Sequence, residues 1–245
     1  MDWTAPVDIY CERLDGSFWA EPLNAVSNAA FVLAALWAAR TAIERHITRL
    51  AVWVPIVLAA LIGIGSFLFH TFATPWAGVA DVLPIWLFVA SYALAAISVL
   101  GGTPMWRVGV FALIAMIVGA LIWVVGQAGA PTSDVAAHTH NGPGAHGHTH
   151  GDERSRFNGS EQYFPVVIAM IVFSAAAWWR GHPIRAWFIA ATATFMLSLT
   201  LRTYDMALCP VWPYGTHVFW HLLNGTMIAL LLQALIRNTH KEHTP

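Results

Sequence analysis

The stretch LAVWVPIVLAALIGIGSFLFH, residues 50–70, contains no Asp, Glu, Lys or Arg. Its length matches the roughly 20 predominantly apolar residues that an α-helix needs to cross about 30 Å of hydrocarbon. The stretch therefore predicts a membrane-spanning helix. Its end is unusual, because the apolar run finishes with Ser66 and His70, and Asp81 follows eleven residues later. Ionisable groups inside membrane spans are costly and usually functional, so this end of the helix is a candidate site.

Similar apolar runs recur along the whole chain. Hydrophobic residues make up 58% of the 245 residues and charged residues only 10%, whereas soluble domains carry about 25% charged residues. An open sheet cannot satisfy its backbone hydrogen bonds in lipid, and the runs have the length of helices. We therefore predict an all-α membrane protein, a seven-transmembrane helix bundle that forms a single domain over residues 1–245. The predicted spans cover residues 22–43, 48–70, 78–100, 106–128, 162–179, 184–202 and 214–236.

The distribution of Lys and Arg predicts how this bundle is oriented, because these residues favour cytoplasmic loops. Seven spans place the termini on opposite sides, and most basic residues are cytoplasmic if the C-terminal tail, residues 237–245, lies inside. The outer N-terminal segment, residues 1–21, then faces outward with the candidate site. The compact loops favour a bacterial inner-membrane protein. The basic residues predicted on the cytoplasmic side are Arg40, Arg45, Arg49, Arg107, Arg180, Arg185, Arg237 and Lys241.

The segment between the predicted fourth and fifth spans has a different composition. It contains HTHNGPGAHGHTHGD, residues 138–152, in which five histidines alternate with Gly, Pro and other small or polar residues. Such a sequence cannot build a packed core, so we predict a flexible His-rich outer loop over residues 129–161. A weak metal-collecting role and a tolerated low-complexity loop are both compatible with this composition.

His217 and His221 are four residues apart, so a helix places them on one face. They open the last predicted span, at the same membrane level as His70 in the predicted orientation. Three neutral histidines with a fourth position open to water are typical of a catalytic zinc site. The pattern therefore predicts that His70, His217 and His221 bind zinc. Hydrogen bonding between neighbouring helices is the alternative explanation of the same residues.

Ser66 and Asp81 are the candidate catalytic residues beside these histidines. A buried carboxylate needs a cation or a proton, and Asp81 could act as a general base toward an attacking water. Ser66 lies one turn before His70 and could donate a hydrogen bond to a developing oxyanion. The alternatives are structural: Asp81 would be a helix-start carboxylate favoured by the macrodipole, and Ser66 would bond back to its own helix.

Two further polar residues accompany the candidate ligands. Asn224 follows His221 by three residues and shares its helix face, so it could support the metal site through a hydrogen bond. Asp205 follows Arg202 by three residues, and it could either orient a ligand or pair with that arginine.

Together, these motifs resemble the alkaline ceramidases, seven-span zinc-dependent lipid amidases whose superfamily includes the adiponectin receptors. The resemblance lies in S-x-x-x-H followed by Asp at residues 66–81, in YCERLDGSFWAEPLNAVSN at residues 10–28, and in RTYDMALCPVWPYGTHVFWHLLNG at residues 202–225. It implies zinc bound by the three histidines and catalytic roles for Ser66 and Asp81. The implied reaction is hydrolysis of ceramide or a similar N-acyl lipid to a fatty acid and a sphingoid-type amine.

The same resemblance implies a calcium ion and a disulfide near the N-terminus. Calcium prefers oxygen ligands. The Glu12–Glu21 gap is shorter here than in the animal members, and solvated acids beside a helix start are the alternative. The candidate calcium ligands are Asp8, Tyr10 through its carbonyl, Glu12, Asp15 and Glu21.

The family pairs cysteines at positions matching Cys11 and Cys209, which both fall in outer segments where an oxidising compartment permits a disulfide.

A zinc-binding membrane receptor or a metal transporter without amidase activity is the alternative function. The His-rich loop favours transport, but transporter ligands usually lie near the membrane midplane between internal repeats, and the sequence shows no repeat. The expected partner is a membrane lipid substrate. The net charge of −1 gives no electrostatic basis for binding nucleic acid, and no protein partner is evident.

Overall fold

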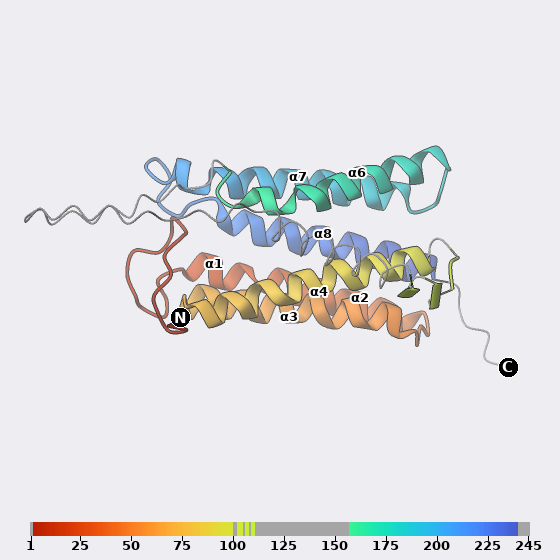
Figure 1. The fold of residues 1–245 in the computed structure, drawn as a ribbon, viewed down its shortest axis with the longest axis horizontal. Helices are drawn as coiled ribbons and strands as arrows, with labels where there is room; N and C mark the ends of the chain where they lie inside the picture. The colour runs from red at the N-terminus through yellow and green to blue at the C-terminus, as the bar shows by residue number, and fades with distance from the viewer. Residues whose placement is uncertain (1, 100–101, 105, 108, 111–156, 240–245) are drawn as a thin grey trace, which may run out of the picture.

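The computed structural model describes residues 2–99, 102–104, 106–107, 109–110 and 157–239. These residues are helical wherever they form regular structure, and the helices lie lengthwise side by side (Figure 1). The elements are α1 (Pro22–Ser27), α2 (Ala29–Glu44), α3 (Leu50–Phe72), α4 (Pro75–Val99), the 3-10 helix η1 (Ser160–Tyr163), α6 (Phe164–Trp179), α7 (Arg185–Leu208) and α8 (His217–Asn238).

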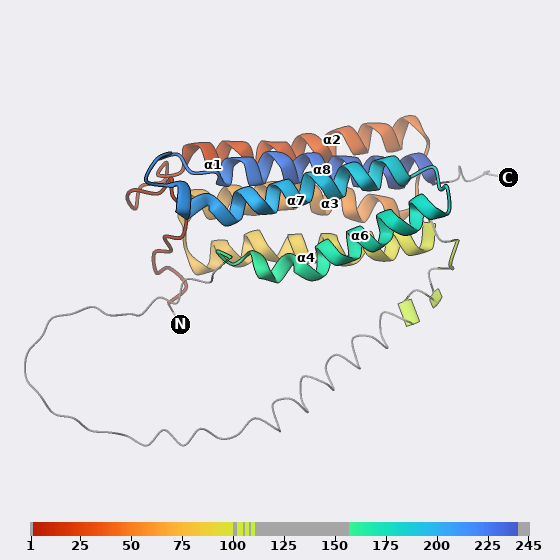
Figure 2. The same ribbon diagram turned by 90° about the horizontal axis from the view of Figure 1, so that it is seen from above.

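Six stretches of the described chain are long and apolar enough to cross a membrane, which confirms six of the predicted spans. The first predicted span consists of α1 and α2 together, over Pro22–Glu44. The predicted span 106–128 and the His-rich loop 129–161 fall almost entirely outside the described residues. The C-terminal end of α4 and the N-terminal end of α6 lie at opposite ends of the bundle (Figures 1 and 2). The count of seven spans stays a prediction.

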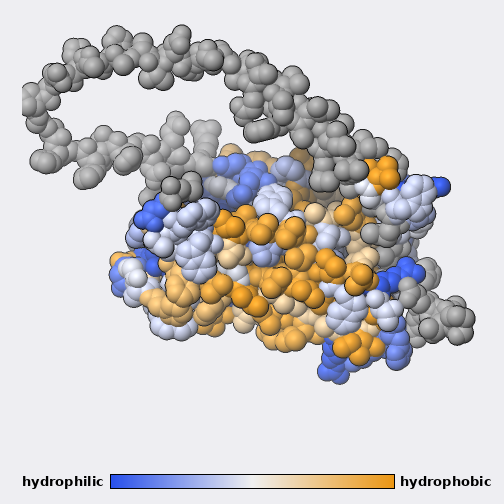
Figure 3. Space-filling view, turned by 60° about the horizontal axis from the view of Figure 1, so that its bottom comes forward, coloured by the Kyte–Doolittle hydropathy of each residue, from blue (hydrophilic) through white to orange (hydrophobic). Residues whose placement is uncertain are grey.

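Helix α8 is the central helix of the described bundle. In the most apolar stretch of α8, 72% of the residues are buried, whereas the same fraction is 22% for α4 and 22% for the span containing α6. It packs against α1, α2, α3, α4 and α7. The outer helices expose large apolar side chains, and Figure 3 shows a broad hydrophobic band between hydrophilic patches at the two ends of the molecule. This surface suits a protein embedded in lipid, because apolar side chains on it need no aqueous solvation.

A tight turn joins α3 to α4. Ala73 has the left-handed φ of 44°, and its N–H donates to the carbonyl of Phe69, which closes the last turn of α3. Helix α4 begins at Pro75, three residues before the predicted start. Proline fits the first turn of a helix because its missing N–H has no intrahelical partner there.

The hairpin formed by α3 and α4 closes tightly at Gly65. A Cβ atom at this position would collide with the backbone carbonyl of Ala80, so only glycine permits the observed distance between the two helices. Since Ser66 and Asp81 are the next residues on each helix, this approach brings the two candidate catalytic residues to the same place in the bundle.

Helix α7 extends to Leu208, six residues beyond the predicted end of its span at 202. The apolar run stops at Arg202, but that side chain is buried and satisfied: its guanidinium donates to the carbonyl of Asn158 at 2.8 Å and to the hydroxyl of Ser160 at 3.1 Å. Asp205 is also fully buried and hydrogen-bonded. Charged residues with internal partners do not end a helix, so the hydropathy pattern placed this boundary too early.

Candidate metal centre and active site

The three histidines predicted to bind metal meet at one end of the bundle. His70 lies in the last turn of α3, and His217 and His221 lie in the first two turns of α8. Their side chains are buried, with exposed fractions of 1–2%. One ligand nitrogen from each ring lies within 4.8 Å of the others, so this histidine triad could hold a metal ion. The predicted grouping of these three histidines is confirmed, and zinc as their ligand stays a prediction.

Hydrogen bonds fix which nitrogen of His221 faces the triad. The Ser27 hydroxyl donates to the carbonyl of Asn24 at 2.9 Å, so its single proton is committed. Ser27 must therefore accept from Nδ1–H of His221, which lies 2.8 Å away. In the neutral ring, Nε2 of His221 then carries a lone pair.

The same reasoning applies to His70. Its Nδ1 lies 2.6 Å from the Glu21 carboxylate, which can only accept, so Nδ1 carries the proton and Nε2 of the neutral ring carries a lone pair. Nε2 of His70 and Nε2 of His221 face each other at 3.1 Å. Two lone pairs at this distance repel unless a cation lies between them. Two nitrogen ligands of one tetrahedral zinc lie about 3.3 Å apart, so the donor set fits such an ion.

His217 supplies the third candidate ligand. Its Nδ1 is buried and has no hydrogen-bond partner within the described chain. Such an orphaned nitrogen is rare in a protein interior, and ligation of the ring would account for it. The ring of Tyr10 stacks on the imidazole, with centroids 3.8 Å apart, and shields it from the N-terminal side.

The two candidate catalytic residues lie beside the triad. Ser66 is buried one turn before His70 on α3, and Asp81 is half-buried on α4. The Asp81 carboxylate interacts with the Ser66 hydroxyl and with the charge of Arg202, and His70 lies near it. The structure therefore places a carboxylate and a hydroxyl next to three imidazoles. Their catalytic roles stay a prediction.

Asp205 organises the start of α8 rather than pairing with Arg202. One carboxylate oxygen accepts from the backbone N–H groups of Thr216 and His217, at 2.6 and 2.9 Å, and the other accepts from the N–H of Cys11 at 3.2 Å. A carboxylate at a helix N-terminus satisfies free N–H groups and interacts favourably with the macrodipole. Gly215, with φ of 65°, makes room, because a Cβ there would collide with the carboxylate.

Asn224 lies one turn beyond His221, and its hydrogen bonds within the described chain do not involve the rings of the triad. Its amide donates to the Ser198 hydroxyl at 3.0 Å and to the carbonyl of Trp220 at 2.9 Å. The bond to Ser198 ties α8 to α7 just below the triad, whereas the bond to Trp220 lies within α8. Asn224 also lines the apolar cavity described below, so its support of the site is through packing of the two helices.

The N-terminal acids predicted to bind calcium have other partners. Glu12 accepts the N–H groups of Leu23 and Asn24 with its two oxygens, at 2.7 and 2.8 Å, and so satisfies the start of α1. Burial raises the pKa of Glu12, and those two N–H groups oppose the rise. Asp8 and Asp15 are exposed, and Asp15 accepts the N–H of Ser17. Among the described residues, no group of acids forms a cluster like that of the triad. Calcium binding stays a prediction.

Glu21 acts on the triad directly, which the sequence pattern did not indicate. Its Oε2 lies 2.6 Å from Nδ1 of His70 and accepts from the Asn24 amide, and its Oε1 pairs with Arg13 at 2.5 Å. Burial disfavours the charged carboxylate, but the hydrogen bonds from His70 and Asn24 and the charge of Arg13 outweigh it and lower the pKa of Glu21. The ionised carboxylate therefore holds His70 in the orientation described above. Carboxylate–histidine pairs of this kind commonly orient metal ligands.

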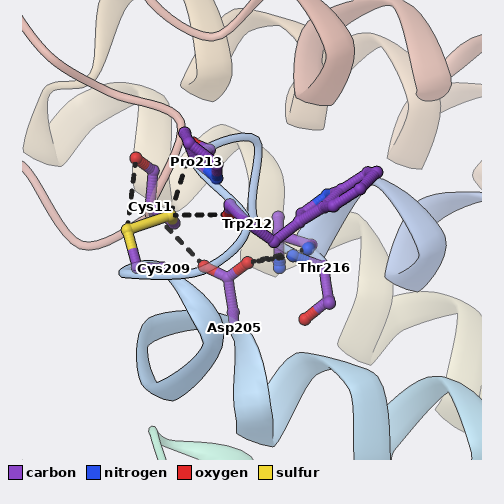
Figure 4. The surroundings of a disulfide bond; sticks show 7 residues. Cys11, Asp205, Cys209, Trp212, Pro213 and Thr216 are labelled. Carbon is purple, nitrogen blue, oxygen red and sulfur yellow. Dashed lines mark hydrogen bonds between the residues drawn. A yellow bond between two sulfur atoms is a disulfide. The ribbon is translucent and has the colours of Figure 1, made fainter.

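A disulfide connects the N-terminal segment to the chain just before α8. Cys11 and Cys209 are bonded, with their Cα atoms 5.5 Å apart, as the family resemblance implied. Figure 4 shows the bond beside Asp205 and the loop that leads through Trp212 and Pro213 to Thr216. The covalent link and the carboxylate together hold the N-terminal segment against the first turn of α8, where His217 lies.

An apolar cavity of about 390 Å³ lies within the bundle, and it begins at Trp220, the residue before His221, and runs toward the opposite end. Trp220 and Asn224 line its near end, and Ala96 and Leu231 line it further along α4 and α8. The eleven residue-to-residue steps from Trp220 to Leu231 correspond to about 16 Å of helix, roughly half the hydrocarbon thickness of a bilayer. The cavity thus has the length and character of a site for one lipid chain.

Fold and site together define a polytopic, helical membrane protein with a candidate metal centre at one end. A family model described as Ceramidase matches residues 4–133, slightly more than half of the chain. The chain belongs to the ceramidase family, which confirms the predicted resemblance, and this membership implies an enzyme that hydrolyses a lipid amide. The match includes Ser66, His70 and Asp81, and it ends before the two histidines of α8. Comparison with curated proteins gave no match.

Replacing Cys11 with Ser is expected to lower the free energy of unfolding by about 2–5 kcal/mol, because the disulfide closes a loop across most of the chain. Thermal unfolding in detergent, with and without a reductant, measures the effect. The reductant should lower the Tm of the wild type and leave the variant unchanged. Mass spectrometry that finds both thiols free in protein taken directly from the membrane would contradict the predicted role of this bond.

Proposed function

We propose that the protein is a zinc-dependent intramembrane hydrolase that cleaves the amide bond of ceramide or a similar N-acyl lipid. The products are a free fatty acid and a sphingoid-type amine. The observation that carries the proposal is the buried triad, in which Nε2 of His70 and Nε2 of His221 face each other at 3.1 Å beside Ser66 and Asp81. Family membership supports the reaction class, and the donor set supports zinc, which is typically bound by three histidines in catalytic sites.

His70, His217 and His221 would hold the zinc ion. When bound, zinc polarises a carbonyl and lowers the pKa of water toward 7, which supplies electrophilic and nucleophilic activation at neutral pH. Glu21 and Ser27 hold the rings of His70 and His221, so that their lone pairs point to a common place. Preorganised ligands of this kind need no rearrangement during the reaction.

Asp81 is positioned to move the proton. As a general base it accepts a proton from the water that attacks the acyl carbon, and it then donates this proton to the nitrogen of the departing amine. The carbon–nitrogen bond breaks as the proton reaches the nitrogen, so the products are the acid and the free amine. Ser66 donates its hydrogen bond to the Asp81 carboxylate before the reaction. Once Asp81 has taken up the proton from water, the Ser66 hydroxyl turns and donates a hydrogen bond to the carbonyl oxygen, where negative charge develops.

The apolar cavity would bind one of the hydrocarbon chains of the substrate. The cavity begins beside Trp220, and the centroids of the Trp220 and His217 rings are 6.4 Å apart. A lipid with its hydrocarbon chain in the cavity would therefore have its polar end near the triad. This arrangement suits a substrate that stays in the bilayer during the reaction.

We also propose the orientation that the basic residues predict, with the triad on the outer side. Arg40, Arg45 and Arg237 lie together around a surface pocket between the ends of α2 and α8, at the end of the bundle opposite the triad. Basic residues at one end support a cytoplasmic location of that end. A bacterial inner membrane stays a prediction from sequence alone.

A metal transporter gains no support, because the triad lies at helix ends rather than near the middle of the bundle.

Replacing His217 with Ala, or Asp81 with Ala, should reduce fatty-acid release by about 10²–10⁴-fold, because each change removes a candidate ligand or the candidate base. The assay measures release from ceramides and other N-acyl lipids by purified protein, with and without a chelator. His46→Asn is the matched control: this exposed histidine has a left-handed φ of 56°, which asparagine tolerates. Full activity in either variant would remove that residue from the mechanism. A receptor without amidase activity would release nothing in any arm.

Replacing Ala96 with Phe should shorten the cavity and lower kcat/KM for long-chain substrates by about tenfold relative to short-chain ones. Ala96 is buried and lines the cavity, whereas its neighbour Ile97 is 40% exposed and does not. Ile97→Phe is therefore the control and should leave the chain-length profile unchanged. An Ala96→Phe variant with a wild-type profile would show that the chain binds elsewhere.

A further inference from the structure

A buried arginine joins the N-terminal segment to the triad. The side chain of Arg13 is only 5% exposed, although it belongs to a segment without regular secondary structure. All three of its guanidinium nitrogens have partners: Nε pairs with Glu21 at 2.5 Å, and the other two donate to the carbonyls of Asp15 at 3.2 Å and His70 at 3.1 Å. A buried charge is tolerated only when it is paired in this way.

Arg13 therefore reaches His70 by two routes. Through Glu21 it neutralises the carboxylate that accepts from Nδ1 of the His70 ring. Directly, it binds the His70 carbonyl, which belongs to the last turn of α3, where backbone carbonyls lack intrahelical partners. One cation thus fixes both the ring and the backbone of a single candidate ligand, and its planar fork of donors suits this geometry better than a lysine would.

The oxygens implied as calcium ligands do not fit a bound calcium ion around this arginine. Both oxygens of Glu12 and both oxygens of Glu21 already accept N–H donors, and the Tyr10 carbonyl accepts the N–H of Arg13. Calcium takes six to eight oxygen ligands, and among the described residues no three of these carboxylates converge on one point. It would also have to share Glu21 with a guanidinium that stays charged at any physiological pH.

We propose that Arg13 is a positioning residue that serves as a built-in cation for the N-terminal segment, in place of calcium. The inference rests on the proposed zinc site. The Glu21–His70 pair depends on the positive charge of the Arg13 side chain, which is part of the protein and cannot be removed by a chelator. Consequently the metal affinity of the triad and the stability of the N-terminal segment are independent of calcium.

The test compares zinc affinity, measured by competition with a chelator, and Tm, measured with and without calcium, in the wild type and in variants of Arg13. Arg13→Ala should bind zinc about 10–100-fold more weakly, since losing a group that orients a ligand has effects of this size. Arg13→Lys, which keeps the charge but not the fork, should lie between the two. The wild type should show no calcium binding by isothermal titration and no change of Tm or zinc affinity when calcium is added.

Ile236→Ala is the control for a general loss of stability, because this residue is fully buried near the far end of α8. It should lower the Tm without weakening zinc binding. Wild-type zinc affinity in Arg13→Ala would overturn the inference, and so would calcium binding by the wild type. Should Arg13→Ala fail to fold, Arg13→Lys and the calcium titration still decide the matter. A wild-type protein that binds no zinc would instead refute the proposed function, while the calcium titration would still test the role of Arg13.

Discussion

The arrangement of this protein depends on three imidazole rings that must share a small buried space. Nε2 of His70 and Nε2 of His221 lie 3.1 Å apart. When both rings are neutral and protonated on Nδ1, their lone pairs face each other, which is unfavourable without a cation between them. The surrounding groups hold the rings in this arrangement and do not reduce the repulsion between them. Glu21 and Ser27 fix two of the rings, and Asp205 fixes the backbone of the third. A constellation that is costly alone and favourable with a divalent ion is the expected form of a metal site.

The membrane setting explains why these groups gather at one end. Buried polar groups need partners, and lipid offers none, so polar side chains within spans bond to one another or to backbone groups freed at helix ends. The last turn of α3, the first turn of α8 and the N-terminal segment supply such groups, and the disulfide holds these pieces together. The apolar cavity then continues from near this polar end into the bundle, which agrees with the proposed binding of a lipid's polar linkage at the triad and of its chain in the cavity.

Periodicity and hydropathy were sufficient to predict most of the fold and the triad. The spans follow from apolar runs, and the i, i+4 spacing of His217 and His221 places both on one face of a helix. The partners could not be predicted from these patterns. Glu21 lies 49 residues from His70 in sequence, and nothing in its spacing distinguishes an acid that orients a ligand from one that binds calcium. The end of α7 was misplaced because hydropathy treats Arg202 as solvated, whereas tertiary contacts satisfy it.

The most direct test of the account is the metal content and coordination of purified, folded protein, obtained from elemental analysis and X-ray absorption at the zinc edge. The account predicts about one zinc per chain, with nitrogen ligands at about 2.0 Å, and loss of this signal when His70 is replaced by Ala. Folded wild-type protein that contains no metal after zinc has been supplied, or zinc bound equally well without His70, would contradict it.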